Sequence, residues 1–233
     1  MLTYALCFIV FNEAQGCVLD VPRIDLTQFD QVYAVDGGST DGTVETLTRF
    51  GVRVFKQKQG SLNAAYREAV EACECDNLLI FFPKGTLDLT ILKAIRDRLA
   101  AGTELVIASR LIQGGRNEED RQFFRPRKTG IKALALFSAL VWRRNGPMVW
   151  DVLHGVKGFT KQAFLRMNPT PKGVSIDLEM VVRSYRLSIS RCEVPVVEEA
   201  RSFGDSRFKI LPTGIQLARY LLAEITRPAK DYS

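Results

Sequence analysis

Short apolar runs alternate with amphipathic segments over the first half of the chain. The runs that are typical of buried strands lie at 4–11, 31–35, 52–55, 77–82 and 104–109. The segments with the periodicity of helices lie near Cys17 and at 42–50, 61–72 and 89–100. Strands that alternate with helices predict a mostly parallel sheet that binds its ligands at the carboxyl ends of the strands.

This alternation changes after Arg110. A polar, charged loop over 113–128 precedes the segment 131–142, IKALALFSALVW, which is apolar nearly all round and has basic residues on both sides. It is too short to span a bilayer, so it predicts either a buried helix or a helix lying in the membrane interface. The remaining elements are expected as helices at 175–185 and 213–226, a strand at 188–196 and a basic loop at 201–209.

Composition is that of a globular protein, with 46% hydrophobic and 25% charged residues in a chain of 233. The apolar N-terminus lacks a basic n-region and soon reaches Asn12 and Glu13, which favours a first buried strand over a signal peptide. The five cysteines are an odd number without a CxxC pair, and His154 is the only histidine. We therefore expect a reduced, cytoplasmic chain without a zinc site.

Positive charge is concentrated in one part of the sequence. The net charge is +6, and the window 110–144 alone has nine Lys and Arg against three acids, an excess of six. Such a patch suits phosphate groups, an anionic membrane surface or nucleic acid, or it is simply a solvated face. No aromatic-interleaved motif or basic recognition helix accompanies it, so we expect no nucleic-acid partner.

The stretch VDGGSTDGT at 35–43 combines carboxylates, glycines and hydroxyls at the end of a predicted strand. A carboxylate at Asp36 can meet ribose hydroxyls or a base edge, and the glycines let the backbone approach a ligand closely. Asp41 then begins a helix with capping chemistry. The alternative is a well-made connection between strand and helix that binds nothing.

This stretch resembles the VDDGSTDGT element of the family 2 glycosyltransferases, which have the GT-A fold. Further segments resemble, in the expected order, motifs of the dolichol-phosphate mannose synthase group. They are FNE at 11–13, KQG with the residues through Ala65 at 58–65, VIASR and GG at 106–115, KGF at 157–159, and EVPV with the following Arg201, Gly204, Ser206 and Arg207. The matches extend over nearly the whole chain.

The resemblance implies a GT-A-like α/β fold with a mostly parallel, mixed central sheet flanked by helices. It implies one domain over 1–233, in which 1–110 is the nucleotide-binding half and 111–233 is an acceptor-side lobe that completes the cleft. The implied activity is inverting transfer of a sugar from a UDP- or GDP-sugar to an acceptor, which in that group is a polyprenyl phosphate. With no transmembrane helix expected, such a lipid would be met from the surface, with peripheral membrane contact through 131–142.

The resemblance, together with the residue types present, predicts roles for individual residues. The predicted nucleotide-binding residues are Phe11, Asn12, Glu13, Asp36, Gly38, Asp41 and Gly60. The predicted phosphate- or acceptor-binding residues are Arg127, Lys128, His154, Arg201 and Arg207, with a packed, hydrogen-bonded role as the alternative for His154. The predicted catalytic residues are Lys84, Arg110, Asp177 and Glu179. A phosphate acceptor is already ionised and needs no base, whereas an alcohol acceptor needs a carboxylate such as Asp177 or Glu179, unless these are surface acids.

The chain departs from the family at its metal site. Family members have an Asp-x-Asp motif after the fourth strand, where this chain reads IFFPKGTLD at 80–88, and the second aspartate of DDGS is Gly37. Bound Mg²⁺ or Mn²⁺ is therefore doubtful, although the acids in 116–120 offer another source of ligands. Either Lys84 supplies the positive charge instead, or the protein is catalytically silent and only binds a nucleotide or sugar.

Overall fold

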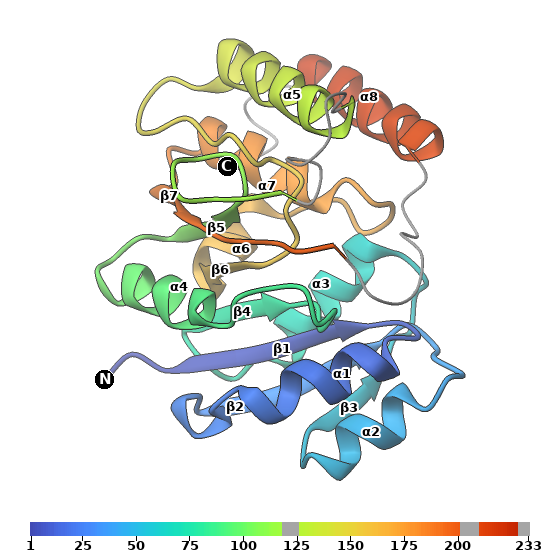
Figure 1. Cartoon of the computed structure of the whole chain (residues 1–233). Helices are drawn as coiled ribbons and strands as arrows, with labels where there is room; N and C mark the ends of the chain where they lie inside the picture. Colours follow the sequence, from blue (N-terminus) through green and yellow to red (C-terminus); the bar gives the residue numbers. More distant parts are fainter. Residues whose placement is uncertain (118–125, 201–209, 228–233) are drawn as a thin grey trace.

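A computed structural model describes residues 1–117, 126–200 and 210–227 (Figure 1). Its centre is a sheet of seven strands in the order β3-β2-β1-β4-β6-β5-β7. All neighbouring strands are parallel except β6, which is antiparallel to both β4 and β5. The bounds are β1 Tyr4–Val10, β2 Gln31–Asp36, β3 Arg53–Lys56, β4 Asn77–Phe81, β5 Leu105–Ser109, β6 Lys157–Thr160 and β7 Arg191–Pro195.

Helices cover both faces of this sheet. Apolar residues of α3, α5, α6, α7 and α8 form a core with one face, and those of α1 and α4, with Leu47 of α2, form a core with the other. The bounds are α1 Ala14–Asp20, α2 Thr43–Arg49, α3 Leu62–Ala72, α4 Thr90–Ala100, α5 Pro126–Trp142, α6 Lys161–Met167, α7 Ile176–Arg186 and α8 Ile210–Thr226. Short 3₁₀ turns lie at Val21–Arg23 and Leu26–Gln28.

Strand β1 shows why the apolar runs of the sequence are continuous rather than alternating. Ala5, Cys7 and Ile9 belong to one core. The even-numbered residues from Leu6 to Val10 belong to the other. Successive side chains of a strand point to opposite faces, so a strand covered on both faces needs apolar residues at every position.

The predicted strands and helices of the first half are all present, and the second half differs in three places. Helix α5 starts at Pro126, inside the predicted loop over 113–128. Strand β6 and helix α6 were not predicted as separate elements. Strand β6 has only four residues, and Gly158 within it has no side chain because a Cβ there would lie 2.3 Å from Ile95 Cγ2 of α4. So short a segment carries no alternation from which to predict a strand.

Helix α1 approaches the loop after β4 more closely than a side chain would permit. A Cβ on Gly16 would lie 2.1 Å from the carbonyl oxygen of Pro83 and 3.0 Å from Lys84 Cα. The same helix ends with Asp20, whose Oδ2 accepts hydrogen bonds from the backbone N–H groups of Lys84 (2.9 Å) and Gly85 (2.8 Å). The helix therefore fixes the backbone of Lys84 by close packing and by hydrogen bonds.

The substitution Gly16→Ala is expected to lower the free energy of unfolding by about 2 kcal/mol, because the methyl group meets backbone atoms that cannot rotate away. The matched control is Gly130→Ala in α5, where an added Cβ meets nothing within 4 Å. That change is expected to stabilise by about 0.5 kcal/mol through helix propensity. Urea unfolding of both variants checks this, and equal stabilities for Gly16→Ala and the wild type would contradict the packing.

Candidate functional site

The turns after β1 and β2 are joined by hydrogen bonds from their motif residues. The backbone N–H of Asn12 donates to Ser39 Oγ (2.7 Å), and the N–H of Thr40 donates to Asn12 Oδ1 (2.7 Å). The N–H of Ala14 donates to Asp41 Oδ2 (3.1 Å). Asn12 has a φ of 52°, a left-handed conformation that asparagine tolerates. Two predicted nucleotide ligands, Asn12 and Asp41, therefore shape the turns with their side chains.

Glu13 takes part in the same hydrogen-bonded connection between the two turns. Its backbone N–H donates to Thr43 Oγ1 (2.8 Å), and Thr43 Oγ1 in turn donates to Asp41 Oδ1 (2.5 Å). The two turns thus form one rigid rim at the carboxyl ends of β1 and β2. Their relative position is set by side chains of the motif rather than by a ligand.

Asp36 is 3% exposed and both of its carboxylate oxygens are engaged by its own turn. Oδ2 accepts from the N–H groups of Gly38 (2.9 Å) and Ser39 (3.0 Å), and Oδ1 accepts from Ser39 Oγ (2.5 Å). Gly38 has a φ of 95°, which the turn requires and which glycine adopts without strain. A carboxylate has about four lone-pair sites, so these bonds leave Asp36 little capacity for a second partner.

Gly37 stands where the family that the sequence resembles has an aspartate, and local packing explains this difference. A Cβ on this residue would lie 3.3 Å from Phe11 Cβ, which is a tight contact. It would lie 3.5 Å from Gln57 Oε1, which is an ordinary contact. Phe11 is itself 46% exposed. The glycine thus allows an accessible aromatic side chain to lie against the turn, where an aspartate would press on it.

Lys84 lies at the carboxyl end of β4, in the loop that Asp20 fixes. Its Nζ is 5.7 Å from the centre of the Phe82 ring. Burial raises the pKa of the Glu198 carboxyl, but the positive charges around it, led by Arg110 and including Lys84, outweigh burial and lower it. The ammonium group of Lys84 therefore acts electrostatically on the same cluster as Arg110.

Arg110, at the end of β5, is held by two acids. Its Nε and Nη2 donate to the two oxygens of Asp151 (2.8 and 2.9 Å), and its Nη1 donates to Glu198 Oε2 (2.8 Å). The side chains of Arg110, Asp151 and Glu198 are 16%, 0% and 12% exposed. The guanidinium of Arg110 is thus engaged by two carboxylates, and its catalytic role stays a prediction.

His154 is a packed residue and not a cationic phosphate ligand. It is 4% exposed, and its Nδ1 lies 3.4 Å from the carbonyl oxygen of Val156. Burial, together with the charge of Arg110, lowers the pKa of His154 to about 4. Its imidazole is neutral at neutral pH, which corrects the predicted role and agrees with the packed alternative.

Glu179 is fully buried, and its carboxylate has a structural role. Its carboxylate accepts from the backbone N–H of Thr170 (2.8 Å), from Ser175 Oγ (2.6 Å) and from Asn63 Nδ2 (3.1 Å). Arg183 adds an ion pair at 3.4 Å. These bonds hold the loop before α7 against the start of α3, and they give Glu179 no access to an acceptor.

Asp177, two residues earlier, is the more accessible of the two acids, with its side chain 11% exposed. Its Oδ1 accepts from Lys157 Nζ (2.6 Å) and lies 3.2 Å from Tyr66 Oη. The Lys157 side chain is 1% exposed, so this is a buried lysine that the acid neutralises. Sequence reasoning did not identify this pair, because the two residues are 20 positions apart and no local pattern encodes their contact.

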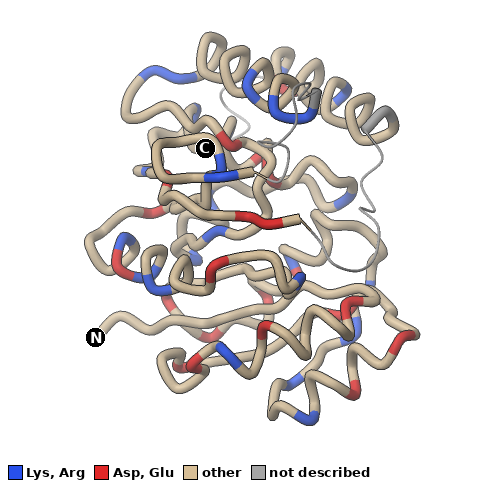
Figure 2. Tube along the Cα trace, in the orientation of Figure 1, with Lys and Arg blue, Asp and Glu red and all other residues tan. Residues whose placement is uncertain are grey.

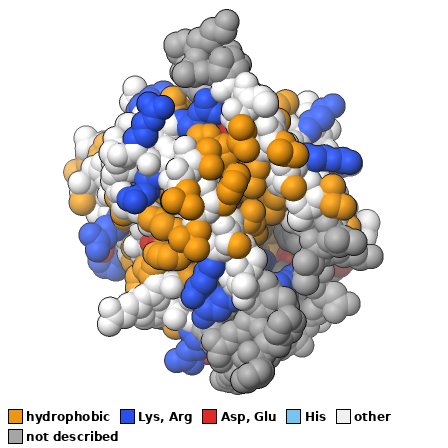
Figure 3. All heavy atoms as spheres, turned by 90° about the horizontal axis from the view of Figure 1, so that it is seen from above, with side chains coloured by type: hydrophobic (Ala, Val, Ile, Leu, Met, Phe, Trp, Pro, Cys, Tyr) orange, Lys and Arg blue, Asp and Glu red, His pale blue; other side chains and the backbone are white. Residues whose placement is uncertain are grey.

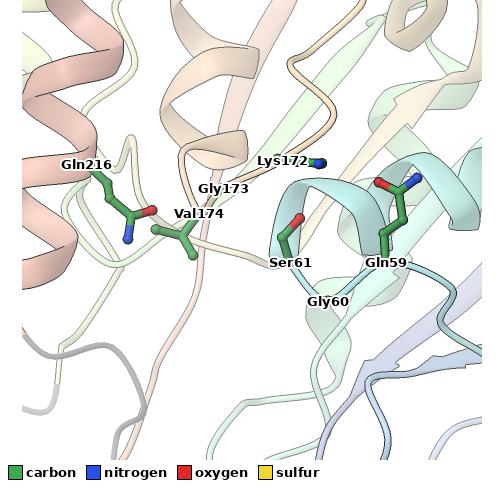
Figure 4. A pocket seen from close by; sticks show the side chains of 7 residues that line it. All are labelled: Gln59, Gly60, Ser61, Lys172, Gly173, Val174 and Gln216. Atoms are coloured by element: carbon green, nitrogen blue, oxygen red, sulfur yellow. The ribbon is translucent and has the colours of Figure 1, made fainter.

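Gly60 lines a surface pocket of about 590 Å³ (Figure 4). The pocket lies between the loop before α3, the loop before α7 and the side of α8, and Gln216 of α8 points toward it. The other lining residues are Gln59, Ser61, Lys172, Gly173 and Val174. Asp36 and Lys84 do not line this pocket, so the structure does not bring all predicted ligands into one cavity.

Arg127 and Lys128 are in the first turn of α5 and are partly exposed. Arg201 and Arg207 lie outside the described residues, as do the three consecutive acids of 118–120.

The described residues do not fit a divalent metal. They contain no group of three or more His, Cys, Asp or Glu side chains that could hold one. At the carboxyl end of β4, Asp20 Oδ2 accepts from two backbone amides and Glu198 Oε2 accepts from Arg110. Asp20 Oδ1 is buried without a hydrogen-bond partner in the described part of the chain, but one such oxygen does not supply the set of ligands that Mg²⁺ or Mn²⁺ needs.

No protein-family model matches the chain. Glycosyltransferase AglJ of Haloferax volcanii is 29% identical over 203 residues, which cover 86% of this chain. The chain spans 65% of the length of that relative.

Solved structures share the architecture of the chain. Glucosyl-3-phosphoglycerate synthase from Mycobacterium tuberculosis, in complex with Mn²⁺, UDP and glucosyl-3-phosphoglycerate, matches with a TM-score of 0.73 and 19% identity over 97% of this chain and 81% of the synthase. Its complex with Mn²⁺ and UDP-glucose matches with a TM-score of 0.71 and 19% identity over 97% and 80%. These matches confirm the predicted GT-A-like fold with a mixed, mostly parallel sheet.

Stability is expected to fall as the pH is lowered from about 6.5 to 4. The pKa of His154 is near 4 in the folded protein and about 6.5 in the unfolded chain, so the unfolded state binds this proton first. The expected loss from this group is about 3 kcal/mol. Urea unfolding across this range checks it with His154→Gln as the comparison, which should lose less stability with acid. Identical pH dependence in both proteins would contradict the assignment.

Proposed function

We propose that the protein is an inverting glycosyltransferase that moves a sugar from a UDP- or GDP-sugar to a phosphorylated acceptor. The observation that carries this proposal is the match in fold, over 97% of the chain, to a synthase solved with UDP and UDP-glucose. The 29% identity to a protein named glycosyltransferase supports it. So does the VDGGSTDGT motif, which stands at the carboxyl end of β2 where α/β sheets bind ligands.

The donor's nucleoside is assigned to the rim formed by the turns after β1 and β2. The half-exposed ring of Phe11 beside Gly37 offers a face on which a base can stack. The glycines of the turn permit close approach of the ribose. In this assignment Asp36, Asn12 and Asp41 contribute by keeping the rim rigid, and Gly60 borders the site from the loop before α3.

The diphosphate is assigned to cations of the protein instead of a metal. Lys84 occupies the loop where the family that the sequence resembles has its Asp-x-Asp motif, and its backbone is fixed by Asp20. An ammonium group placed before the reaction stabilises the charge that develops on a departing diphosphate. We assign Arg201 and Arg207 to the same task on the basis of the sequence resemblance.

The acceptor is proposed to carry a phosphate, and a polyprenyl phosphate is the form that the sequence resemblance implies. Crystal structures of the synthase contain glycerol 3-phosphate or phosphoglyceric acid together with UDP-glucose, and both of these molecules carry a phosphate. A phosphate oxygen is ionised at neutral pH and attacks without a base. For an alcohol acceptor, Asp177 is the remaining candidate base, with Lys157 holding its carboxylate. Arg127 and Lys128 are proposed to bind the acceptor phosphate.

On this account, residues 1–110 form the nucleotide side and residues 111–233 the acceptor side of one domain. A cytoplasmic location is in keeping with the free cysteines. A lipid acceptor would then be met at the membrane surface, with 131–142 as the contacting segment.

A second candidate function is binding without catalysis. The engagement of Arg110 by Asp151 and Glu198 favours it, as does the lack of a metal cluster among the described residues. Such a protein would retain the nucleotide rim and lack transfer.

Incubation with a panel of UDP- and GDP-sugars separates the two functions. An active transferase is expected to release UDP or GDP slowly from one donor by hydrolysis, and faster when a matching phosphorylated acceptor is present. Detection of the free nucleotide diphosphate measures both reactions. Binding of a donor without release under any condition would support the silent protein and reject the transferase.

Chelation of divalent ions tests the role of the protein's own cations. The reaction rate is expected to stay within about twofold of its original value in EDTA, because positive charge at the diphosphate comes from side chains. Loss of turnover in EDTA and its recovery with Mn²⁺ or Mg²⁺ would show that a metal is required.

A further inference from the structure

Helix α5 is apolar on two opposite faces. Its inward face is buried through Ile131, Ala135, Ala139 and Trp142. Its outward face presents Leu136, Phe137, Leu140 and Val141, which are 47%, 39%, 85% and 47% exposed. These four follow the spacing of one helical face, so α5 has a second apolar stripe that the fold does not cover.

Helix α8 has the same property, which the sequence did not reveal. Leu217, Tyr220 and Leu221 are buried. Ile215, Leu222 and Ile225 are 48%, 66% and 50% exposed and recur at helical spacing. Helices α5 and α8 lie on the same side of the fold (Figure 1), and the view onto that side shows a broad band of hydrophobic side chains (Figure 3).

Basic residues accompany this band. Lys132, Arg143 and Arg144 are exposed on and directly after α5, and Arg219 is exposed on α8 between Ile215 and Leu222. In the described parts of these two helices the acid is Glu224, which is 2% exposed and is paired with Arg186. Figure 2 shows mostly basic positions along the traces of these two helices, and Figure 3 shows blue side chains around the band and few red ones.

We propose that the outward faces of α5 and α8 together form a docking surface for an anionic lipid bilayer. Exposed aliphatic side chains enter the boundary between headgroups and acyl chains, and the basic residues meet lipid phosphates. A second copy of the chain fits less well, because an isologous contact brings two basic rims together. No helix in the described part of the chain is long and apolar enough to cross a membrane, so the contact is with the surface.

Docking through this surface does not depend on sugar transfer and is measured without a donor. It does bear on the proposed function. Gln216 of α8 lines the pocket of about 590 Å³, so a bilayer beneath α8 lies next to that pocket. A lipid-borne phosphate would then reach the pocket edge without leaving the membrane.

Sedimentation with phosphatidylcholine vesicles, with and without phosphatidylglycerol, tests the surface. The wild type is expected to sediment with the anionic vesicles and to dissociate at high salt. Leu140→Asp on α5 and Leu222→Asp on α8 are each expected to weaken binding about tenfold, since each removes an inserted aliphatic group. The matched control is Leu165→Asp on α6, which is 61% exposed, lies outside the surface and should bind as the wild type does.

Two further variants test how much positive charge contributes to vesicle binding. Arg219→Gln is expected to weaken binding to anionic vesicles about fivefold, and Arg49→Gln on the distant α2 is expected to leave it unchanged. Circular dichroism melting of every variant shows whether the fold is retained.

Several results would overturn the proposal. The docking surface does not exist if the wild type fails to sediment with anionic vesicles. If Leu222→Asp binds the vesicles as tightly as the wild type does, α8 is not part of the surface. A dimer in analytical ultracentrifugation that Leu140→Asp dissociates would assign the face to a second copy. Donor hydrolysis without vesicle binding would reject the docking surface alone, and vesicle binding without hydrolysis would reject the transferase alone.

Discussion

The ion pair of Arg110 with Asp151 and Glu198 holds the carboxyl edge of the sheet together. It joins the end of β5 to the loop before β6 and to the segment after β7, which are far apart in sequence. Burying these charges costs desolvation free energy. The bidentate hydrogen bonds to Asp151 and the further hydrogen bond to Glu198 offset that cost. Removal of one partner would leave a buried charge unpaired at a cost of about 3–5 kcal/mol. The edge is therefore rigid before any ligand arrives.

A second fixed contact sets the place of Lys84 on this edge. Asp20 binds the backbone of the loop after β4, and Gly16 lets the helix come close enough for it to do so. This contact places the ammonium group of Lys84 beside the Arg110 cluster, whose acids are already bound to Arg110. In our account, the positive charge that other enzymes of this fold obtain from a metal comes here from the chain.

The sequence predicted much of the fold because its strands are buried on both faces and leave long apolar runs, as in β1. It predicted the turn at Asp36 because glycines and capping residues mark turns locally. It did not predict how those side chains are used, since Asp36 accepts from amides of its own turn, and Asp41 accepts from the amides of Thr43 in its own turn and of Ala14 after β1. Pairs such as Arg110 with Glu198 are separated by 88 positions, and no local pattern encodes a contact of that range.

Equilibrium binding of UDP and GDP in the presence of EDTA tests the central claim most directly. Isothermal titration of the wild type should show binding of one of them without a divalent ion. Lys84→Met should weaken that binding at least about tenfold, because a charge-assisted contact to the diphosphate is lost. Lys93→Met, on the exposed surface of α4, should bind as the wild type does. Binding that appears only when Mn²⁺ is added, or that is unchanged in Lys84→Met, would contradict the account.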